Sequence, residues 1–279
     1  MAFAEGQIDM NTNAPANDAR TSSLTSTVVL IHGAWMTPAS WDNFRAKLED
    51  AGYTVHAPTW PFLGRGTAAE LRANPPKGLG SLTAGAIADH YAKFIETLPE
   101  KPLIIGHSMG GLVTQLLLDR GYGAAGVLLD PAPVAGIIAD PVSLLAALPV
   151  VARWNAWNRP YTLSKATFDA KFANTAPAAL RDEAYEKYMV PTSGRIFAQA
   201  ATGLGIAIDV RKRTQPLLVT AAQFDKTVAP ALSRKIYRKH RKAPGRTDFV
   251  EFPGLSHFLM TEPGYEKVAD HVIEWARSL

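Results

Sequence analysis

Short apolar runs alternate along this chain with segments whose apolar residues recur at helical spacing. The runs are rich in Val, Ile and Leu, which is typical of strands buried on both faces of a sheet. The segments between them place apolar residues three or four positions apart, as Trp41, Phe44 and Leu48 do, and this spacing predicts amphipathic helices. The alternation predicts an α/β fold with a mainly parallel sheet flanked by helices. The predicted strands are 27–31, 53–58, 102–106, 125–130, 216–225 and 247–252, and the predicted helices are 40–52, 81–98, 109–121, 230–240 and 264–279.

The strand pattern lapses between residues 134 and 215. This stretch has helical segments, many aromatic residues and no clear strand, so it predicts a helical cap inserted over the C-terminal edge of the sheet. Residues 27–133 and 216–279 then form the α/β core. Residues 1–26 are polar and rich in small residues, which predicts a flexible N-terminal arm.

Composition and charge narrow the classes of protein. The chain has 279 residues, 47% of them hydrophobic, which suits one large domain with a sizeable core. It has no cysteine, which excludes disulfides, cysteine metal sites and cysteine nucleophiles. Seven of its Lys and Arg residues lie between Arg234 and Arg246. We interpret this isolated cluster as the solvated face and C-terminal end of a helix, so no nucleic-acid partner is predicted.

No stretch reaches the roughly 18 uninterrupted apolar residues that a membrane-spanning helix needs. The N-terminus has neither the basic region nor the apolar region of a readable signal peptide. We therefore predict a cytoplasmic protein without a membrane span. The sequence leaves the oligomeric state open, a homo-oligomer included.

The segment GHSMG, residues 106–110, places Ser108 between a predicted strand and a predicted helix. This G-x-S-x-G pattern in this context is typical of a nucleophile elbow, where a sharp turn projects the serine above the sheet edge. Neighbouring chains pass so close that side chains at Gly106 and Gly110 would collide. The helix also aims its N-terminal N–H groups at the site, which favours developing negative charge. These features predict that Ser108 is a catalytic nucleophile.

A serine hydroxyl needs a base to take its proton. Among the seven histidines, His257 lies in a loop between the last predicted strand and the last predicted helix. That loop opens onto the same sheet edge as Ser108, which favours His257 as the base. The other histidines lie within helices, at a strand end, in the basic cluster, in the elbow itself or in the loop after the first strand.

The base in turn needs a carboxylate to hold its tautomer and stabilise its charged form. Asp225 and Asp130 each end a predicted strand on the required edge, and either fits the chain order Ser, Asp, His. We favour Asp225, because its strand lies nearer in sequence to the loop of His257. The alternative interpretation of Asp130 is a turn residue before Pro131.

Donors for an oxyanion are expected from two backbone N–H groups. The segment LIHGAW follows the first strand, and its Gly33 lets the loop kink so that the N–H of Ala34 points at the nucleophile. The N–H of Met109 is the predicted second donor. We expect Trp35 to wall a substrate pocket and His32 to brace its loop. Trp154 and Trp157 are expected to face the cleft from the cap, whereas the spacing of Phe168 and Phe172 indicates core packing.

Together, H-G-A-W at 32–35, G-H-S-M-G-G at 106–111, F-D-K-T-V at 224–228 and S-H-F at 256–258 resemble the cap-bearing enzymes of the α/β-hydrolase fold. The resemblance covers residues 27–279. It implies an eight-stranded core, of which about six strands can be read here. Relatives with an aspartate nucleophile, such as epoxide hydrolases and haloalkane dehalogenases, are disfavoured by Ser108. Hydroxynitrile lyases carry a lysine beside the catalytic histidine, where this chain has Phe258.

The resemblance implies a serine hydrolase that cleaves small to medium apolar carboxylic esters through an acyl-enzyme. A cofactor-free haloperoxidase or perhydrolase, a thioesterase and a C–C bond hydrolase are variants of the same machinery. A ligand-binding receptor that retains the triad is the non-enzymatic alternative. No His/Glu cluster at metal-ligand spacing and no nucleotide-binding motif is present, so neither a metal nor a cofactor is predicted.

Overall fold

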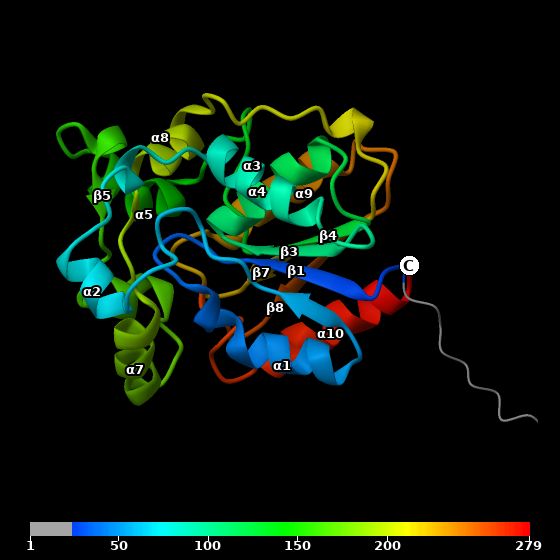
Figure 1. Ribbon diagram of the computed structural model, residues 1–279, viewed down its shortest axis with the longest axis horizontal. Coiled ribbons are helices and arrows are strands. Elements are labelled where there is room, and N and C mark those ends of the chain that lie inside the picture. The colour runs from blue at the N-terminus through cyan, green and yellow to red at the C-terminus, as the bar shows by residue number, and fades with distance from the viewer. Residues whose placement is uncertain (1–23) are drawn as a thin grey trace, which may run out of the picture.

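The main sheet of the protein has six parallel strands in the order β2-β1-β3-β4-β7-β8 (Figure 1). The structure is a computed structural model that describes residues 24–279. All six predicted strands are confirmed, as is the mainly parallel α/β sheet. Their bounds are β1 (Thr27–Ile31), β2 (Thr54–His56), β3 (Leu103–His107), β4 (Ala125–Leu129), β7 (Leu217–Ala222) and β8 (Thr247–Phe252).

Helices cover both faces of this sheet. Helices α1 and α10 lie on one face, and α3, α4 and α9 lie on the other (Figure 1). Helix α4 is buried along almost its whole length, because it packs between the sheet and α3. The predicted helices are confirmed as α1 (Asp42–Asp50), α3 (Ala84–Ile95), α4 (Met109–Asp119), α9 (Pro230–His240) and α10 (Tyr265–Arg277).

The segment between β4 and β7 holds most of the remaining helices, which lie beside one end of the sheet (Figure 1). They are α5 (Pro141–Val151), α6 (Lys165–Thr167), a π-helix (Phe168–Phe172), α7 (Ala178–Tyr188) and α8 (Gly194–Thr202). The segment also contains a small antiparallel pair, β5 (Pro160–Tyr161) and β6 (Thr192–Ser193). The sequence did not predict this pair, because two residues are too few to show a period.

Helix α2 (Ala68–Ala73) was also missed. Its signal was present as a capping box, in which Thr67 accepts the N–H of Glu70 and Glu70 accepts the N–H of Thr67. Single turns of 3-10 helix occupy Pro38–Trp41, Leu79–Ser81, Ala156–Asn158 and Val210–Lys212.

Phe168 and Phe172 join the segment to the core. Both are buried and stack with ring centroids 5.5 Å apart, which confirms their predicted packing role. Phe168 also contacts Phe258, in the loop between β8 and α10, at 5.7 Å. Residues 1–23 of the predicted N-terminal arm lie outside the described residues. Within residues 24–279, no helix is both long and apolar enough to cross a membrane.

Candidate active site

Ser108 sits in a strained turn between β3 and α4. Its φ of 54° lies in the left-handed region, which a residue with a side chain rarely adopts. Backbone hydrogen bonds hold it there, because its N–H donates to the carbonyl of Leu129 at 2.9 Å and its carbonyl accepts the N–H of Ala132 at 2.9 Å. Ser108 is therefore fixed between two strand ends, as an elbow requires.

Two glycines make room for this turn. A Cβ at Gly106 would lie 2.2 Å from the hydroxyl of Thr114 and 2.3 Å from the carbonyl of Gly110. A Cβ at Gly110 would lie 2.1 Å from the carbonyl of Ile31. All three distances are far below van der Waals contact, so the elbow packs against β1 and α4 only with glycine at these positions.

We expect Gly110→Ala to lower the free energy of unfolding by about 3 kcal/mol or more, because backbone atoms of β1 cannot move away from the added methyl. Urea unfolding measures this loss. Gly85→Ala in α3 is the matched control, since the nearest atom to its Cβ is 3.8 Å away. The control is expected to be neutral or to gain up to about 1 kcal/mol. Equal stability of both variants would contradict the steric account.

His257 and Asp225 form a buried pair on the loops after β8 and β7. His257 Nδ1 lies 2.5 Å from Asp225 Oδ2, and both side chains are fully buried. The other oxygen of Asp225 accepts the N–H groups of Thr227 at 2.6 Å and Val228 at 2.8 Å. The carboxylate thus has its position set by the loop after β7, and it sets the orientation of the imidazole.

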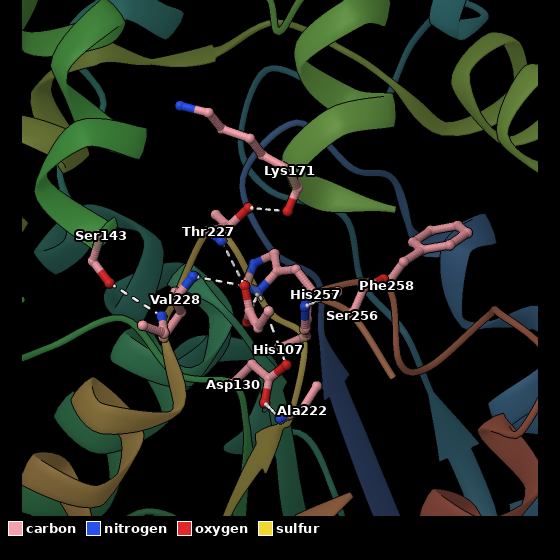
Figure 2. A network of polar contacts seen from close by, with 12 residues as sticks. His107, Asp130, Ser143, Lys171, Ala222, Thr227, Val228, Ser256, His257 and Phe258 are labelled. Atoms are coloured by element: carbon pink, nitrogen blue, oxygen red, sulfur yellow. Dashed lines mark hydrogen bonds and ion pairs between the residues drawn. The ribbon is translucent and has the colours of Figure 1, made fainter. Parts of the chain in front are cut away.

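Asp130, the alternative acid, lies close to the same pair (Figure 2). Its Oδ2 is 4.0 Å from His257 Nδ1, which is beyond hydrogen-bond distance. Its Oδ1 accepts the N–H of Ala222, the last residue of β7, at 2.8 Å. Asp130 has a φ of 45° and is fully buried. The sequence placed both carboxyls at this edge, and the structure pairs the imidazole with Asp225.

Burial disfavours the charged form of each titratable side chain in this cluster. It raises the pKa of Asp225 to about 8 and lowers the pKa of His257 to about 3. The pKa of Asp130 is raised well above its usual range by burial and by the neighbouring Asp225. Two backbone N–H bonds favour the charged form of Asp225, whereas Asp130 receives one. Asp225 therefore ionises before Asp130.

Among the described residues, Asp130, Asp225 and His257 are the one group of three or more His, Cys, Asp or Glu side chains whose possible metal-ligand atoms all lie within 4.8 Å of one another. Asp225 Oδ2 and His257 Nδ1 lie 2.5 Å apart, within hydrogen-bond distance. The geometry fits a direct hydrogen bond.

His107 joins the loop of His257 to the elbow. The ring of His107, the residue before Ser108, donates from Nε2 to the carbonyl of His257 at 2.9 Å. The rings of His107 and Phe172 pack against the imidazole of His257 at 4.6 and 4.7 Å. His257 Nε2 is buried and has no hydrogen-bond partner among residues 24–279. That nitrogen is the atom left to accept a proton.

The loop after β1 lies directly against the elbow. A Cβ at Gly33 would lie 2.9 Å from His107 Nδ1 and 3.1 Å from Ser108 Cβ. His32 braces the loop as expected, because its Nδ1 lies 3.0 Å from the carbonyl of Gly33 and its Nε2 accepts the N–H of Trp60 at 3.2 Å. Ala34 follows Gly33 and is buried. The backbone of Ala34 is thereby brought to the side of the elbow that faces β1.

A pocket opens over Ser108, which is one of its lining residues. Trp35, which the sequence predicts at a pocket wall, lines it, and so does Met109, the residue after Ser108. Its far wall comes from α5, α8 and the loop after β7, which sequence reasoning missed. Small residues dominate this wall: Ala139, Ser143, Ala146, Ala147, Ala200, Ala201, Thr227 and Val228. Leu144, Phe197 and Leu232 add larger apolar surface. The mostly apolar lining with a few polar groups is of the kind that small-molecule sites show.

Trp35 anchors this wall to the loop after β1. Its φ is 65°, its indole N–H donates to the carbonyl of Tyr161 at 3.0 Å, and its ring lies 4.8 Å from that of Phe197. The carbonyl of Trp35 accepts the N–H of Val190 at 2.8 Å. One residue thus connects the elbow region to β5, α8 and the end of α7.

Trp154 and Trp157 do not line the pocket, so the expectation that they face the cleft is wrong. Trp154 is 88% exposed and Trp157 is 54% exposed. They follow the end of α5 and lie on either side of Asn155, which adopts a left-handed conformation with a φ of 54°. Polar neighbours and a proline marked a helix end in the sequence, but they did not fix the side to which the rings point.

Comparison with known proteins identifies similar chains. The model of the alpha/beta hydrolase family matches residues 28–271. No curated protein matches the sequence. The structure of a monoacylglycerol lipase from Paleococcus ferrophilus superposes with a TM-score of 0.69 at 22% identity, covering 90% of this chain and 94% of that one. A pyrethroid hydrolase from Sphingobium faniae JZ-2 has a TM-score of 0.62 at 18% identity, covering 90% and 97%. A thermophilic esterase from Thermogutta terrifontis has a TM-score of 0.61 at 22% identity, covering 91% and 90%.

Proposed function

The chain belongs to the alpha/beta hydrolase family, and from this premise we propose that it hydrolyses carboxylic esters of small to medium apolar substrates. The proposal rests on one observation above the others. A buried Asp225–His257 pair is hydrogen-bonded to the residue that precedes a strained serine, and that serine opens into an apolar pocket. Esterase and lipase activities of the similar structures agree with this function.

In the proposed reaction Ser108 Oγ attacks the ester carbonyl while His257 Nε2 takes its proton. Asp225 holds the tautomer of His257 that leaves Nε2 free and stabilises the imidazolium that forms. The C–O bond to the alcohol then breaks as His257 returns the proton to the leaving oxygen, which leaves an acyl-enzyme. Water, deprotonated by the same nitrogen, releases the acid and restores Ser108.

The negative charge that develops on the carbonyl oxygen needs donors. We assign this role to the backbone N–H groups of Ala34 and Met109. Met109 is the first residue of α4, so its N–H is among those that a helix leaves without an internal partner. The positive end of the α4 dipole favours charge at the same place.

We further propose that residues 134–215 act as a cap over the core formed by 27–133 and 216–279. Helices α5 and α8 of this segment supply most of the wall opposite Ser108, which supports a role in selecting substrates. The predominance of alanine on that wall leaves room for an acyl chain.

A panel of p-nitrophenyl esters from acetate to palmitate tests the proposed function. We expect turnover with an optimum at short to medium chains, and a burst of p-nitrophenol where deacylation is slow. A receptor that retains the triad would bind these esters without repeated turnover. A thioesterase, a perhydrolase or a C–C bond hydrolase would turn over its own substrate class at least about tenfold faster than the best ester. None of these alternatives has a specific observation in its favour.

The alanines of the wall give a prediction about chain length. We expect Ala147→Phe to lower kcat/KM on octanoate about fiftyfold, because it displaces about three methylenes at about 0.8 kcal/mol each. Activity on acetate should stay within about twofold. Ala152→Phe, at the exposed end of α5, is the matched control and should leave the profile unchanged. A parallel loss on all chain lengths would mean that the acyl group does not occupy this pocket.

The buried imidazole gives a prediction about pH. The neutral form of His257 is the base, so kcat/KM rises as pH increases through the pKa of this group in the free enzyme. Burial lowers that pKa to about 3, so the acid limb is expected to lie below the ordinary histidine value of about 6.5. Measuring kcat/KM between pH 4 and 8, with activity re-assayed at pH 7 to exclude unfolding, checks this. A midpoint at 6.5 or above would show that the charge of Asp225 outweighs burial.

A further inference from the structure

Exposed large apolar side chains gather in one short stretch of the chain. Of the eleven in residues 24–279, seven lie between Ile138 and Trp157. We call them the α5 face: Ile138, Val142, Leu144, Leu145, Leu148, Trp154 and Trp157. Isolated exposed apolar residues are ordinary on a soluble protein, but seven in one stretch mark a surface for interaction.

Helix α5 itself has no charged residue over its eleven positions. Its outer side exposes Leu145 by 59% and Leu148 by 50%, whereas its inner side lines the pocket with Ala146 and Ala147. Leu144 is 49% exposed and also lines the pocket, so it contributes to both sides of the helix. The pocket over Ser108 and the α5 face therefore lie on opposite sides of one helix.

Cations flank the α5 face on two sides. On one side a hollow is lined by Lys235, Arg238, Lys239 and Lys242 of α9 and its C-terminal end together with residues 136–138. Lys235 Nζ donates to the carbonyl of Ile138 at 2.9 Å, so the basic row and the apolar face are continuous. On the other side Arg195 Nε donates to the carbonyl of Trp157 at 3.1 Å.

The acid nearest in sequence is Asp140, the N-cap of α5. Its carboxylate accepts the N–H groups of Val142 at 2.9 Å and Ser143 at 3.2 Å, and the hydroxyl of Ser143 at 2.8 Å. These bonds and the positive end of the helix offset its charge. The α5 face therefore presents apolar side chains inside a basic border.

We propose that the α5 face docks on an anionic lipid surface. Aliphatic side chains would enter the acyl region, the two tryptophans would lie at the level of the headgroups, and the basic border would pair with lipid phosphates. A second copy of this chain fits less well, because a self-complementary contact would bring the two basic borders close together. The proposal explains two sequence features that the pocket does not use, the tryptophans and the basic cluster.

Docking of this kind would place the pocket beside a lipid phase. On the basis of the proposed function, the substrates are then esters dissolved in or forming that phase, which reach Ser108 past α5. The docking test does not depend on catalysis, so failure of one proposal is distinguishable from failure of the other.

The experiment measures co-sedimentation of the full chain carrying Ser108→Ala with vesicles, so that no lipid is consumed. Vesicles of phosphatidylcholine are compared with vesicles in which about one third of the lipid is anionic phosphatidylglycerol. We expect binding to the anionic vesicles, weakened by salt. Leu145→Gln with Leu148→Gln should weaken binding at least about tenfold. Arg238→Gln with Lys242→Gln should weaken it about 25-fold, at about fivefold for each cation.

Matched controls lie elsewhere on the molecule. Lys93→Gln with Lys267→Gln removes the same charge from exposed positions of α3 and α10, and Leu24→Gln removes an exposed leucine near β1. Both should leave vesicle binding unchanged. With Ser108 restored, Leu145→Gln with Leu148→Gln should leave hydrolysis of a soluble monomeric ester unchanged while lowering hydrolysis of vesicle-borne esters.

Three results would overturn the proposal. Equal losses in the control variants would show that binding is not carried by the α5 face. A dimer in light scattering without lipid, converted to monomer by Leu145→Gln with Leu148→Gln, would assign the face to a second copy. Vesicle binding that appears only after deletion of residues 1–23 would show that the α5 face is the docking site of the N-terminal segment of the same chain.

Discussion

Ser108→Ala is expected to lower kcat on p-nitrophenyl esters by on the order of 10⁴ or more. The reason is that the nucleophile, the base and the acid act as a unit, so that removing the first makes the other two useless for covalent catalysis. Ser108 is only 7% exposed and held by backbone hydrogen bonds of its turn. Loss of its hydroxyl should leave that turn intact, and substrate binding should change little.

Ser143→Ala provides the comparison within the same pocket. Ser143 also lines the cavity, but its hydroxyl donates to Asp140 and accepts the N–H of Ala229 rather than facing a base. We expect this variant to keep kcat within about tenfold. Covalent labelling with an organophosphonate should reach Ser108 in the wild-type protein and vanish in Ser108→Ala. Turnover that persists in Ser108→Ala would remove the basis of the proposed function.

The central strands of the sheet could be predicted because they are buried on both faces and therefore nearly all apolar. β1, β3 and β4 are buried at every position, and the sequence shows each as a continuous apolar run. Elements that depend on tertiary contacts gave no such signal. The pair of β5 and β6 is two residues long, and its Ser193 hydroxyl donates to the carbonyl of Leu82, far away in sequence.

The candidate site likewise has residues that the sequence predicts and residues that it does not. Ser108, Asp225 and His257 each follow a strand, so the topology alone brings them to one edge. The pocket wall is different, because Ala147 and Ala200 acquire a role only through the packing of α5 and α8. The sequence also does not show which aromatic side chains of this segment are exposed to solvent. The sequence around Trp154 indicates a residue that faces the cleft, whereas its side chain is 88% exposed.

The two carboxyl groups beside His257 have different roles in the proposed mechanism. Asp225→Asn is expected to lower kcat by on the order of 10⁴, because the amide presents a donor or a weaker acceptor to Nδ1 and no longer holds the tautomer that frees Nε2. The two N–H bonds from Thr227 and Val228 keep one oxygen in place, so the side chain stays where it was. The loss is then chemical and not structural.

Asp130→Asn should change kcat by less than about tenfold. Burial and the neighbouring Asp225 raise the pKa of Asp130 well above its usual range, which favours the neutral form of this carboxyl. Asparagine keeps the hydrogen bond of this side chain, since its oxygen accepts the N–H of Ala222. Asp130→Leu, which leaves the N–H of Ala222 unpaired, should instead lower the free energy of unfolding by about 2 kcal/mol. Steady-state kinetics and urea unfolding of the three variants decide the assignment. A loss of 10⁴ in Asp130→Asn with near-normal turnover in Asp225→Asn would make Asp130 the acid, and the 4.0 Å that separates it from His257 would then have to close during catalysis.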